Sequence, residues 1–415
     1  MKAFSRSVLL FLFALLAAGW TATGLHAESR KWTSSDGKTI QAALVDVLNG
    51  EAVLKLAGPV SNVRVPFARL SAADQEYLKT WVKPAPVTPV PEKPIPGKAA
   101  AEEIVNDATG FPIGTNSTVK RDENGWPEVI ALKEKPTFTV VKEDKMEDIF
   151  IYRSDHFEFH STQRLSGEIV REFSRLFETT FEAVVSLPLR INPKPPAGFF
   201  RVKLYASKDS YISAGGPAGS GGVYMPRTKE VMVPLPYLGV KQIGERWVLD
   251  DRDGNHTLVH EVVHQVMHNW LGRLPVWVVE GIAEYVTAGR YGNGRISLRG
   301  YGKNMNEYKD GGDRGGSTTP LDKLMAMDHN TWSAALTAGG ASRNYRSSML
   351  LFYYFCHEDD DKTGGKMIEY FAARQKQRSD KDQADRDKFL IRGRDAASLQ
   401  KEFRRGIASV GIRPD

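Results

Sequence analysis

The strongest constraint on the fold is a run over residues 256–271 in which polar and apolar residues alternate in pairs. Each of its four polar pairs begins with a histidine, at positions 256, 260, 264 and 268. Four residues advance an α-helix by about 400°, so successive pairs point in nearly the same direction. The run therefore predicts a largely buried helix with one polar stripe, capped by Asp253 or Asn255 and ended by Gly272.

A buried polar stripe costs free energy unless its groups have partners, and a metal ion is one such partner. The segment His260-Glu261-Val262-Val263-His264 has the HExxH form, which places two imidazoles one turn apart with a glutamate beside the first. Imidazole nitrogens are common zinc ligands, and a glutamate at this position can take a proton from water. The pattern predicts that His260 and His264 bind zinc and that Glu261 is a general base.

The remaining positions of the stripe do not repeat this arrangement. His256 is followed by Thr257 and His264 by Gln265, and neither of these side chains can take a proton from water. His256 and His268 lie one turn outside the HExxH segment, about 40° further round the helix. They are predicted to continue the polar face, where they would line a cleft or support the ligands.

A second helix is predicted over residues 275–285, where a proline stands in the first turn. If this helix returns toward the first, Glu280 completes a set of two histidines and one glutamate around zinc and leaves a fourth position for water. Glu284 lies one turn later and is predicted to accept a hydrogen bond from the outer ring nitrogen of a ligand histidine. Gly281 and Ala283 are small enough to let the two helices approach closely.

The HExxH segment and the later WxxEGxAEY segment, residues 277–285, together resemble the gluzincin clan of zinc metallopeptidases, and within it the bacterial peptidase MA-like families. The resemblance implies one Zn²⁺ per chain, held by His260, His264 and Glu280. It also implies a peptide or protein substrate. Glu261 would then receive a proton from zinc-activated water and pass it to the leaving amine.

Enzymes of this kind also need a donor to the oxyanion that develops on the scissile carbonyl. Tyr345 is the candidate, because residues 345–351 have the form YxxSxxL that follows the zinc site in related families. The alternative interpretation of Tyr345 is aromatic packing at the start of a helix. His329 is a weaker candidate for the same role.

The resemblance covers residues 149–415 and implies an α+β peptidase domain, in which a small mixed sheet is followed by a helical part and the zinc site lies on two helices. The apolar pattern agrees with this order. It predicts strands near 157–159, 202–205, 222–225 and 230–233, and a long helix over 165–185. The strand at 222–224 is expected to be the sheet edge that pairs with an extended peptide. The glycine-rich segment 213–222 lacks the lysine of a phosphate-binding loop and is predicted to be a flexible turn.

Residues 1–27 have the form of a cleaved export signal. Lys2 and Arg6 precede an apolar stretch, and the small residue Ala27 is the last residue of the signal. The predicted location is secreted or periplasmic. No later run reaches the roughly 18–20 apolar residues of a transmembrane helix, so no integral membrane segment is predicted after signal removal. Cys356 is the single cysteine, which excludes an internal disulfide, and it is predicted to be a core residue.

Residues 28–82 resemble the SH3-like module called homology domain 1, which implies a small N-terminal β-barrel. The matching segments are residues 30–33 (RKWT), 36–38 (DGK), 65–66 (VP) and 70–74 (LSAAD). Such a module either binds a protein or cell-surface ligand or acts as a spacer. Residues 83–100 are a proline-rich linker, and residues 101–148 are a connecting region of uncertain structure. Residues 99–148 could serve as a propeptide.

The charge balance argues against a nucleic-acid partner. Without Lys2 and Arg6 the chain has 54 Lys and Arg against 50 Asp and Glu. These charges are interspersed, and no DNA or RNA recognition motif is present.

Two other classes of function stay open. The first is a non-catalytic or scaffolding envelope protein that has a structural zinc site and binds partners through the SH3-like module. Glu261 argues against it, because a structural site needs no base. The second is zinc-dependent hydrolysis of a substrate other than a peptide. His357, followed by the acidic residues 358–361, is predicted to belong to a charged helix end and not to a second metal site.

Overall fold

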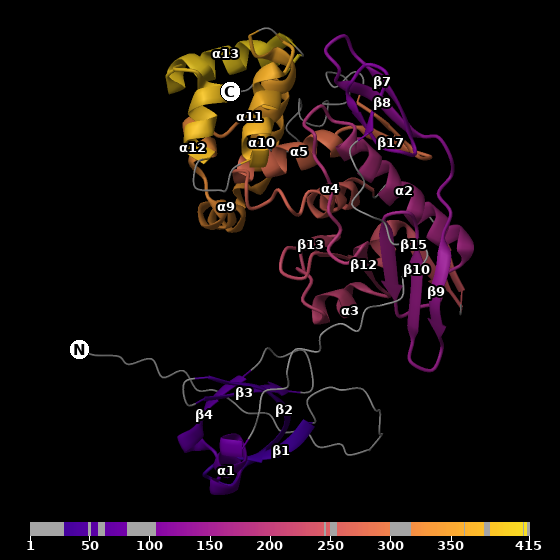
Figure 1. Cartoon of the computed structure of the whole chain (residues 1–415), viewed down its shortest axis with the longest axis vertical. Coiled ribbons are helices and arrows are strands. Elements are labelled where there is room, and N and C mark those ends of the chain that lie inside the picture. Colours follow the sequence, from indigo (N-terminus) through magenta and orange to yellow (C-terminus); the bar gives the residue numbers. More distant parts are fainter. Residues whose placement is uncertain are drawn as a thin grey trace, which may run out of the picture. The chain divides into compact units, whose positions relative to one another are not determined.

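The computed structural model describes residues 29–48, 51–56, 63–80, 105–244, 246–249, 255–298, 317–360, 362–376, 382–409 and 411–412. The chain divides into two compact units, residues 1–92 and 93–415, which are described separately (Figure 1). The fold is mixed α+β, as the sequence predicts. The predicted export signal and proline-rich linker lie outside the described residues.

The first unit is a four-stranded antiparallel sheet, in the order β1-β2-β3-β4, followed by one helix. Its elements are β1 (Ser29–Thr33), β2 (Thr39–Leu48), β3 (Glu51–Leu56), β4 (Val63–Pro66), η1 (Phe67–Arg69) and α1 (Ala72–Thr80). Leu48 of β2 pairs with Glu51 of β3, and the predicted turn residues between them lie outside the described residues. The SH3-like barrel stays a prediction.

One buried aspartate joins the helix of this unit to its sheet. Asp74 in α1 accepts hydrogen bonds from the backbone N–H of Thr33 and from the Arg30 guanidinium, both at 2.7 Å. The guanidinium carbon of Arg30 also lies 3.8 Å from the ring centroid of Tyr77. Beneath them Trp32 is fully buried, and its indole N–H donates to the carbonyl of Ala42 at 3.0 Å.

The second unit is built around a six-stranded mixed sheet in the order β13-β14-β12-β11-β10-β9 (Figure 1). Its strands are β9 (Thr139–Asp144), β10 (Ile149–Arg153), β11 (Phe157–Ser161), β12 (Phe200–Tyr205), β13 (Val223–Met225) and β14 (Glu230–Pro234). β12 runs parallel to β11 and β14, and the other neighbours are antiparallel. Among the described strands, β13 has β14 as its neighbour and ends the sheet, so the predicted sheet edge is confirmed, while its pairing with a peptide stays a prediction.

Strand periodicity divides this sheet into an apolar and a polar face. Phe157 and Phe159 of β11 are buried, and their ring centroids lie 5.1 and 5.2 Å from that of Phe177 in α2 (Gly167–Val185). Glu158, between them, lies on the other face and pairs with Arg153 at 2.6 Å. α2 begins after Ser166, whose side chain accepts a hydrogen bond from the Ile169 N–H, so the predicted long helix is confirmed.

Further short elements connect this sheet to the helices. They are α3 (Lys208–Ser213), η2 (Leu235–Leu238), β15 (Val240–Ile243) and β16 (Arg246–Leu249), the last two forming a hairpin. α4 (Asn255–Val266) and α5 (Val276–Thr287) follow them.

A second sheet brings distant parts of the chain together in the order β17-β18-β8-β7. It combines β7 (Ser117–Arg121) and β8 (Pro127–Leu132) with β17 (Arg290–Gly292) and β18 (Arg295–Ser297), while β5 (Val105–Asn106) and β6 (Pro112–Ile113) form a separate pair. The β17–β18 hairpin interrupts the helical part that is predicted to follow the small mixed sheet. Its turn, Asn293-Gly294, has φ values of 49° and 79°, and Asn-Gly was an available hairpin signal.

Helices form the C-terminal part of the described chain. They are α8 (Leu321–Ala326), α9 (His329–Ala335), η4 (Leu336–Gly340), α10 (Ala341–Tyr353), η5 (Tyr354–Glu358), α11 (Gly365–Lys376), α12 (Asp382–Asp385), η7 (Arg386–Ile391) and α13 (Ala396–Ser409). Among the described residues, no helix is both long and apolar enough to cross a membrane.

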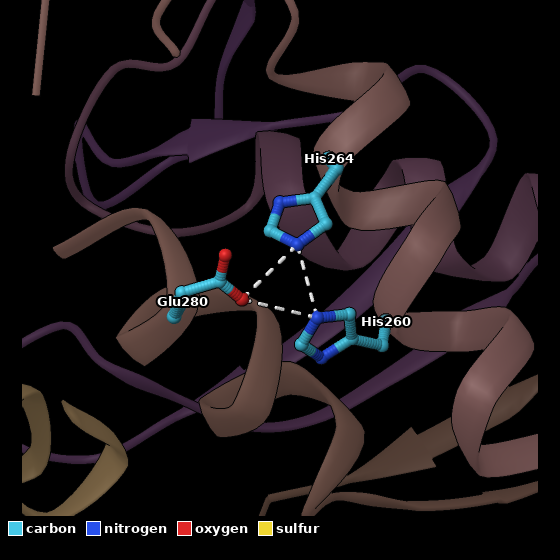
Figure 2. Close-up of side chains that lie close together, drawn as sticks. All are labelled: His260, His264 and Glu280. Atoms are coloured by element: carbon cyan, nitrogen blue, oxygen red, sulfur yellow. Dashed lines mark hydrogen bonds and ion pairs between the residues drawn. The ribbon is translucent and has the colours of Figure 1, made fainter. Parts of the chain in front are cut away.

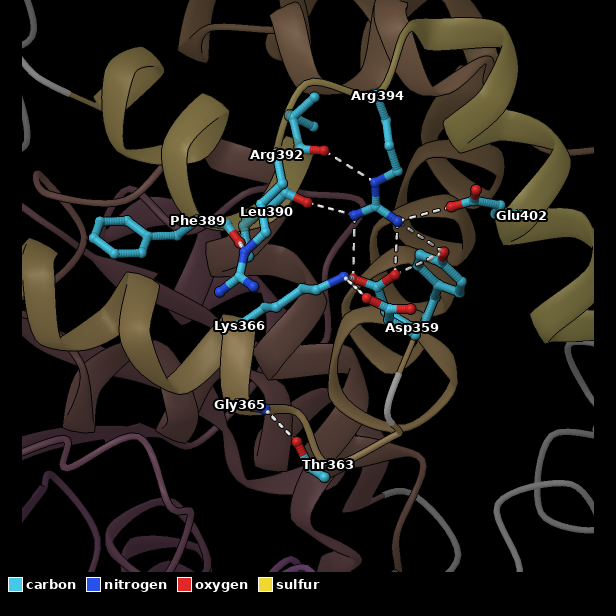
Figure 3. A network of polar contacts seen from close by, with 12 residues as sticks. Asp359, Thr363, Gly365, Lys366, Phe389, Leu390, Arg392, Arg394 and Glu402 are labelled. Atoms are coloured by element: carbon cyan, nitrogen blue, oxygen red, sulfur yellow. Dashed lines mark hydrogen bonds and ion pairs between the residues drawn. The ribbon is translucent and has the colours of Figure 1, made fainter.

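A network of buried and half-buried charges ties the last helices together (Figure 3). Asp359, which follows η5, pairs with Lys366 of α11 at 3.1 Å and with Arg394 at 2.7 Å. Arg394 also pairs with Glu402 of α13 at 2.9 Å. These contacts satisfy the buried Asp359 carboxylate and join three segments of the helical part.

Candidate metal centre

α4 carries the HExxH segment and is shorter than the sequence predicts. It begins at Asn255 and ends at Val266, whereas the apolar pattern continues to Leu271 and Gly272 was the predicted end. Beyond Val266 the chain forms successive turns, in which Trp270 N donates to the Met267 carbonyl at 2.7 Å. The turns reverse the chain before Pro275, the N-cap residue of α5. The predicted helix end was therefore wrong by one to two turns.

The two helices bring His260, His264 and Glu280 together (Figure 2). The Nε2 atoms of the two histidines lie 2.9 Å apart. One Glu280 carboxylate oxygen lies 3.2 Å from Nε2 of His260 and 3.3 Å from Nε2 of His264. Zinc bonds of about 2.1 Å at tetrahedral angles separate ligand atoms by roughly 3.4 Å. The three atoms are therefore spaced as ligands of one metal ion would be.

The surroundings of these atoms favour a cation between them. The Glu280 oxygen is buried and has no hydrogen bond of good geometry, although both imidazoles lie within ion-pair distance of it. Burial acts to raise the pKa of Glu280, but the imidazoles of His264 and His260 outweigh it and hold that pKa well below its usual value. Burial acts to lower the pKa of His260, but Glu280 and Glu284 outweigh it and raise the pKa. A positive charge is thus stabilised at this place, and a metal ion could supply it.

Glu284 lies where the sequence predicts it, beside the outer nitrogen of a candidate ligand. One of its carboxylate oxygens is 3.1 Å from Nδ1 of His260. This contact favours a proton on Nδ1, which leaves the lone pair of Nε2 directed toward His264 and Glu280. The chemistry of the donor set therefore fits a metal ion.

Glu261 faces the edge of the six-stranded sheet. Its carboxylate accepts a hydrogen bond of 2.6 Å from the backbone N–H of Tyr224 in β13. The N–H of an edge strand is thereby connected to the predicted base. Sequence spacing gives no indication of this contact, because 37 residues separate the two partners.

Tyr345 lies next to His260, one of the three candidate ligands. Its ring centroid is 5.7 Å from that of His260, at an interplanar angle of 81°. Burial raises the pKa of Tyr345, and the charges of Glu280, Glu261 and Glu284 raise it further. Its ring centroid also lies 5.4 Å from that of Trp332 in α9. The raised pKa keeps the Tyr345 hydroxyl protonated, so that it can donate a hydrogen bond.

The other histidines considered from the sequence lie in different surroundings. His329 is exposed at the start of α9. His268 follows the end of α4, and its ring centroid lies 6.0 Å from that of Phe200 in β12. Burial lowers the pKa of His268. The side chain of His256 lies outside the described residues.

Gln265, which the sequence excluded as a base, joins α4 to the main sheet. It is fully buried, and its side-chain amide donates to the carbonyls of Arg201 at 2.7 Å and Lys229 at 3.2 Å. These bonds fix α4 against the backbone at the start of β12 and before β14. This role could have been predicted, because a glutamine in the polar stripe of a buried helix must form hydrogen bonds within the protein.

Gly281 was predicted to permit close packing of α5 on α4, but it packs against a different helix. A Cβ atom at this position would lie 2.7 Å from the carbonyl oxygen of Ser348 and 2.9 Å from Cβ of Phe352, both in α10. The glycine therefore permits close packing of α5 on α10, and not of α5 on α4. This contact brings α10, which carries Tyr345, against the helix that carries Glu280.

Cys356 belongs to the interior of the helical part, and His357 beside it is half-buried. Cys356 is fully buried, so its predicted core position is confirmed. Nε2 of His357 lies 3.0 Å from the hydroxyl of Tyr285, and the ring centroid of Trp126 is 5.0 Å away. Among the described residues, one group of His, Cys, Asp or Glu side chains has the spacing to hold a metal, and it consists of His260, His264 and Glu280.

Comparisons with known proteins add a family match over part of the chain. No curated protein matches the sequence at a significant level. The model of a family described as "Protein of unknown function (DUF1570)" matches residues 255–376. This range contains the three candidate ligands as well as Glu261, Glu284 and Tyr345, so the matched region coincides with the candidate metal centre.

Proposed function

We propose that the protein is an exported zinc metallopeptidase of gluzincin type. The observation that carries the proposal is the convergence of His260 Nε2, His264 Nε2 and one Glu280 oxygen at mutual distances of 2.9–3.3 Å. Two imidazoles and one carboxylate are the protein ligands of many catalytic zinc sites, where the fourth position stays open. Glu261, beside the first ligand, supports a catalytic role over a structural one.

A zinc ion held by these residues would act as a Lewis acid, lowering the pKa of a water molecule toward about 7 and polarising the scissile carbonyl. Glu261 accepts a proton from the attacking water and delivers it to the nitrogen of the leaving amine. Tyr345 donates its hydroxyl hydrogen to the oxyanion that develops on the substrate. Glu284 keeps the imidazole of His260 in the required tautomer.

The edge strand β13 suits an extended peptide substrate. A peptide that lies along this edge would pass beside Glu261, because the carboxylate of Glu261 is bonded to the Tyr224 N–H of the same strand. The resemblance to gluzincin peptidases adds to this argument. Peptide or protein is therefore the proposed substrate class.

The N-terminal parts of the chain complete the proposal. Residues 1–27 would direct export, which places the enzyme in the periplasm or outside the cell. The first unit would bind a protein or cell-surface ligand, joined to the enzyme by the proline-rich linker over residues 83–100.

The decisive experiment compares the zinc-loaded full-length protein with its Glu261→Gln variant. Glutamine has the same shape and can still accept from the Tyr224 N–H, but it cannot carry the proton. We expect about one zinc per chain in both proteins, cleavage of a mixed peptide library by the parent, and a loss of turnover of at least about 10³-fold in the variant.

Two results would count against this function. Equal cleavage by both proteins would reject Glu261 as the base. Full zinc loading with no turnover of any peptide, together with ligand capture by the first unit, would favour a scaffolding protein with a structural zinc site.

A further inference from the structure

The glycine-rich segment 213–222 is held in place, in contrast to the flexible turn that the sequence predicts. It leads from the end of α3 directly into β13. Three side chains hold it, and we call them the loop clamp: Lys208 and Tyr211 of α3, and Tyr237 of η2.

Lys208 is the centre of the loop clamp. Its ammonium group donates to the backbone carbonyl of Ser220 and, at 3.4 Å, to that of Pro217. The same group lies 4.7 Å from the ring centroid of Tyr211 and 5.0 Å from that of Tyr237. One cation therefore contacts two carbonyls of the loop and the rings of two aromatic residues.

The two tyrosines lie directly against the loop backbone. The Tyr211 hydroxyl is 2.6 Å from Oγ of Ser220. A Cβ atom at Gly216 would lie 2.3 Å from the Tyr211 ring, and one at Gly221 would lie 2.6 Å from the Tyr237 ring. The two tyrosine rings therefore require glycine at both positions, because any other residue has a Cβ atom where a ring lies.

β13 begins directly after the segment that the loop clamp contacts. β13 has three residues, and its register with β14 rests on the pairs Val223–Met232, Tyr224–Val231 and Met225–Glu230. The central residue of this short strand is Tyr224, whose N–H bonds to the Glu261 carboxylate at 2.6 Å. An edge strand so short depends on its flanking segments for a fixed position.

We propose that Lys208 is a positioning residue for Glu261. Lys208 fixes the loop, the loop fixes β13, and the Tyr224 N–H then orients the Glu261 carboxylate. The proposal rests on the proposed function, in which Glu261 transfers a proton. Lys208 touches none of the three candidate ligands, so its removal is expected to change the orientation of the base while the metal stays bound.

The test uses the full-length zinc-loaded protein with Lys208→Met, which keeps the length of the side chain and removes its charge. Lys203→Met is the matched control, because Lys203 lies on the polar face of β12, outside the loop clamp, and pairs with Glu230 of β14. Hydrogen exchange is measured for backbone amides of residues 214–225, in parallel with kcat, KM and zinc content.

We expect Lys208→Met to accelerate exchange of the Tyr224 amide by about tenfold or more. We also expect kcat to fall by about 10–100-fold while KM and zinc content change less than about twofold, because a displaced base impairs the chemical step. Lys208→Arg keeps a cation between the carbonyls and the rings and should restore kcat to within about threefold of the parent. Lys203→Met should resemble the parent in both measurements.

Two results would overturn the proposal. One is exchange of the Tyr224 amide in Lys208→Met at the rate of the parent. The other is faster exchange without a fall in kcat. A parent protein that cleaves no peptide would contradict the proposed function instead, and the exchange measurement would still decide whether Lys208 holds Tyr224.

Discussion

Nδ1 of His260 lies 3.1 Å from a carboxylate oxygen of Glu284, one helical turn beyond Glu280 on α5. One helix therefore supplies a candidate metal ligand and also the group that orients a second ligand on α4. A neutral imidazole has a single ring proton, and the carboxylate attracts it to Nδ1. The other nitrogen, Nε2, is left with its lone pair toward His264 and Glu280.

This contact predicts the effect of Glu284→Ala on metal affinity. Without the carboxylate, His260 loses the partner that selects its tautomer and ring orientation. Zinc affinity should fall by about 10–100-fold, measured by competition with a chelator at constant pH. Glu369→Ala is the control, since Glu369 pairs with Arg392 on the surface of the helical part. Equal affinities in the two variants would show that Glu284 does not orient His260.

Tyr345→Phe tests the proposed oxyanion donor. The variant removes only the hydroxyl, and the ring can still pack against His260 and Trp332, whose centroids lie 5.7 and 5.4 Å away. We expect kcat to fall by about 100-fold with zinc content unchanged. Tyr353→Phe, in the buried part of the same helix, is the matched control. If both variants show the same kcat, the Tyr345 hydroxyl is not the donor.

Gly281→Ala tests the close contact between α5 and α10. Alanine normally favours a helix over glycine by about 1 kcal/mol. At Gly281, however, the new Cβ would lie 2.7 Å from a backbone oxygen that cannot move without displacing α10. The variant should lose about 1–3 kcal/mol of unfolding free energy in a denaturant titration. Gly272→Ala, where the new Cβ meets nothing within 4 Å, should not show this loss.

The lowered pKa of His357 should make the free energy of unfolding depend on pH. Burial lowers the pKa of His357 from 6.5 to about 3, so at intermediate pH the unfolded chain binds a proton here that the folded protein does not. Its contribution to stability is complete above about pH 6.5 and is lost as the pH falls toward 3. Between pH 7.5 and 5 the zinc-free protein should lose up to about 2 kcal/mol from this group.

His357→Gln isolates this contribution, because glutamine can still form a hydrogen bond with the Tyr285 hydroxyl but does not titrate. The difference in unfolding free energy between pH 7.5 and 5 should be smaller in the variant than in the parent, as measured with urea. An identical pH dependence in the two proteins would contradict a lowered pKa of His357 in the folded protein.

Much of the candidate metal centre could be predicted because its spacing is local. His260 and His264 are one turn apart on a helix, and Glu280 and Glu284 are one turn apart on the next. Helical geometry alone places each pair on one face. The strands β11 and β12 and the helix α2 were predictable for the same reason, since their apolar residues follow the periods of strand and helix.

Contacts between distant residues could not be predicted in this way. The pairing of β8 with β18 joins residues more than 160 positions apart, and the sequence of neither strand indicates which strand it pairs with. The glycines at 216 and 221 indicated flexibility, but the rings of Tyr211 and Tyr237 lie against them and hold the loop. The apolar pattern past Val266 indicated a longer helix, but the chain turns there before Pro275.

The sequence was enough to predict which side chains can meet at a metal ion, because the pitch of an α-helix converts a spacing of four residues into a shared face. The surroundings of these side chains follow from the tertiary structure. It placed the N–H of an edge strand on Glu261, the ring of Tyr345 beside His260, and α10 against Gly281. These contacts depend on how sheets and helices pack, and packing selects partners by shape and burial over the whole chain.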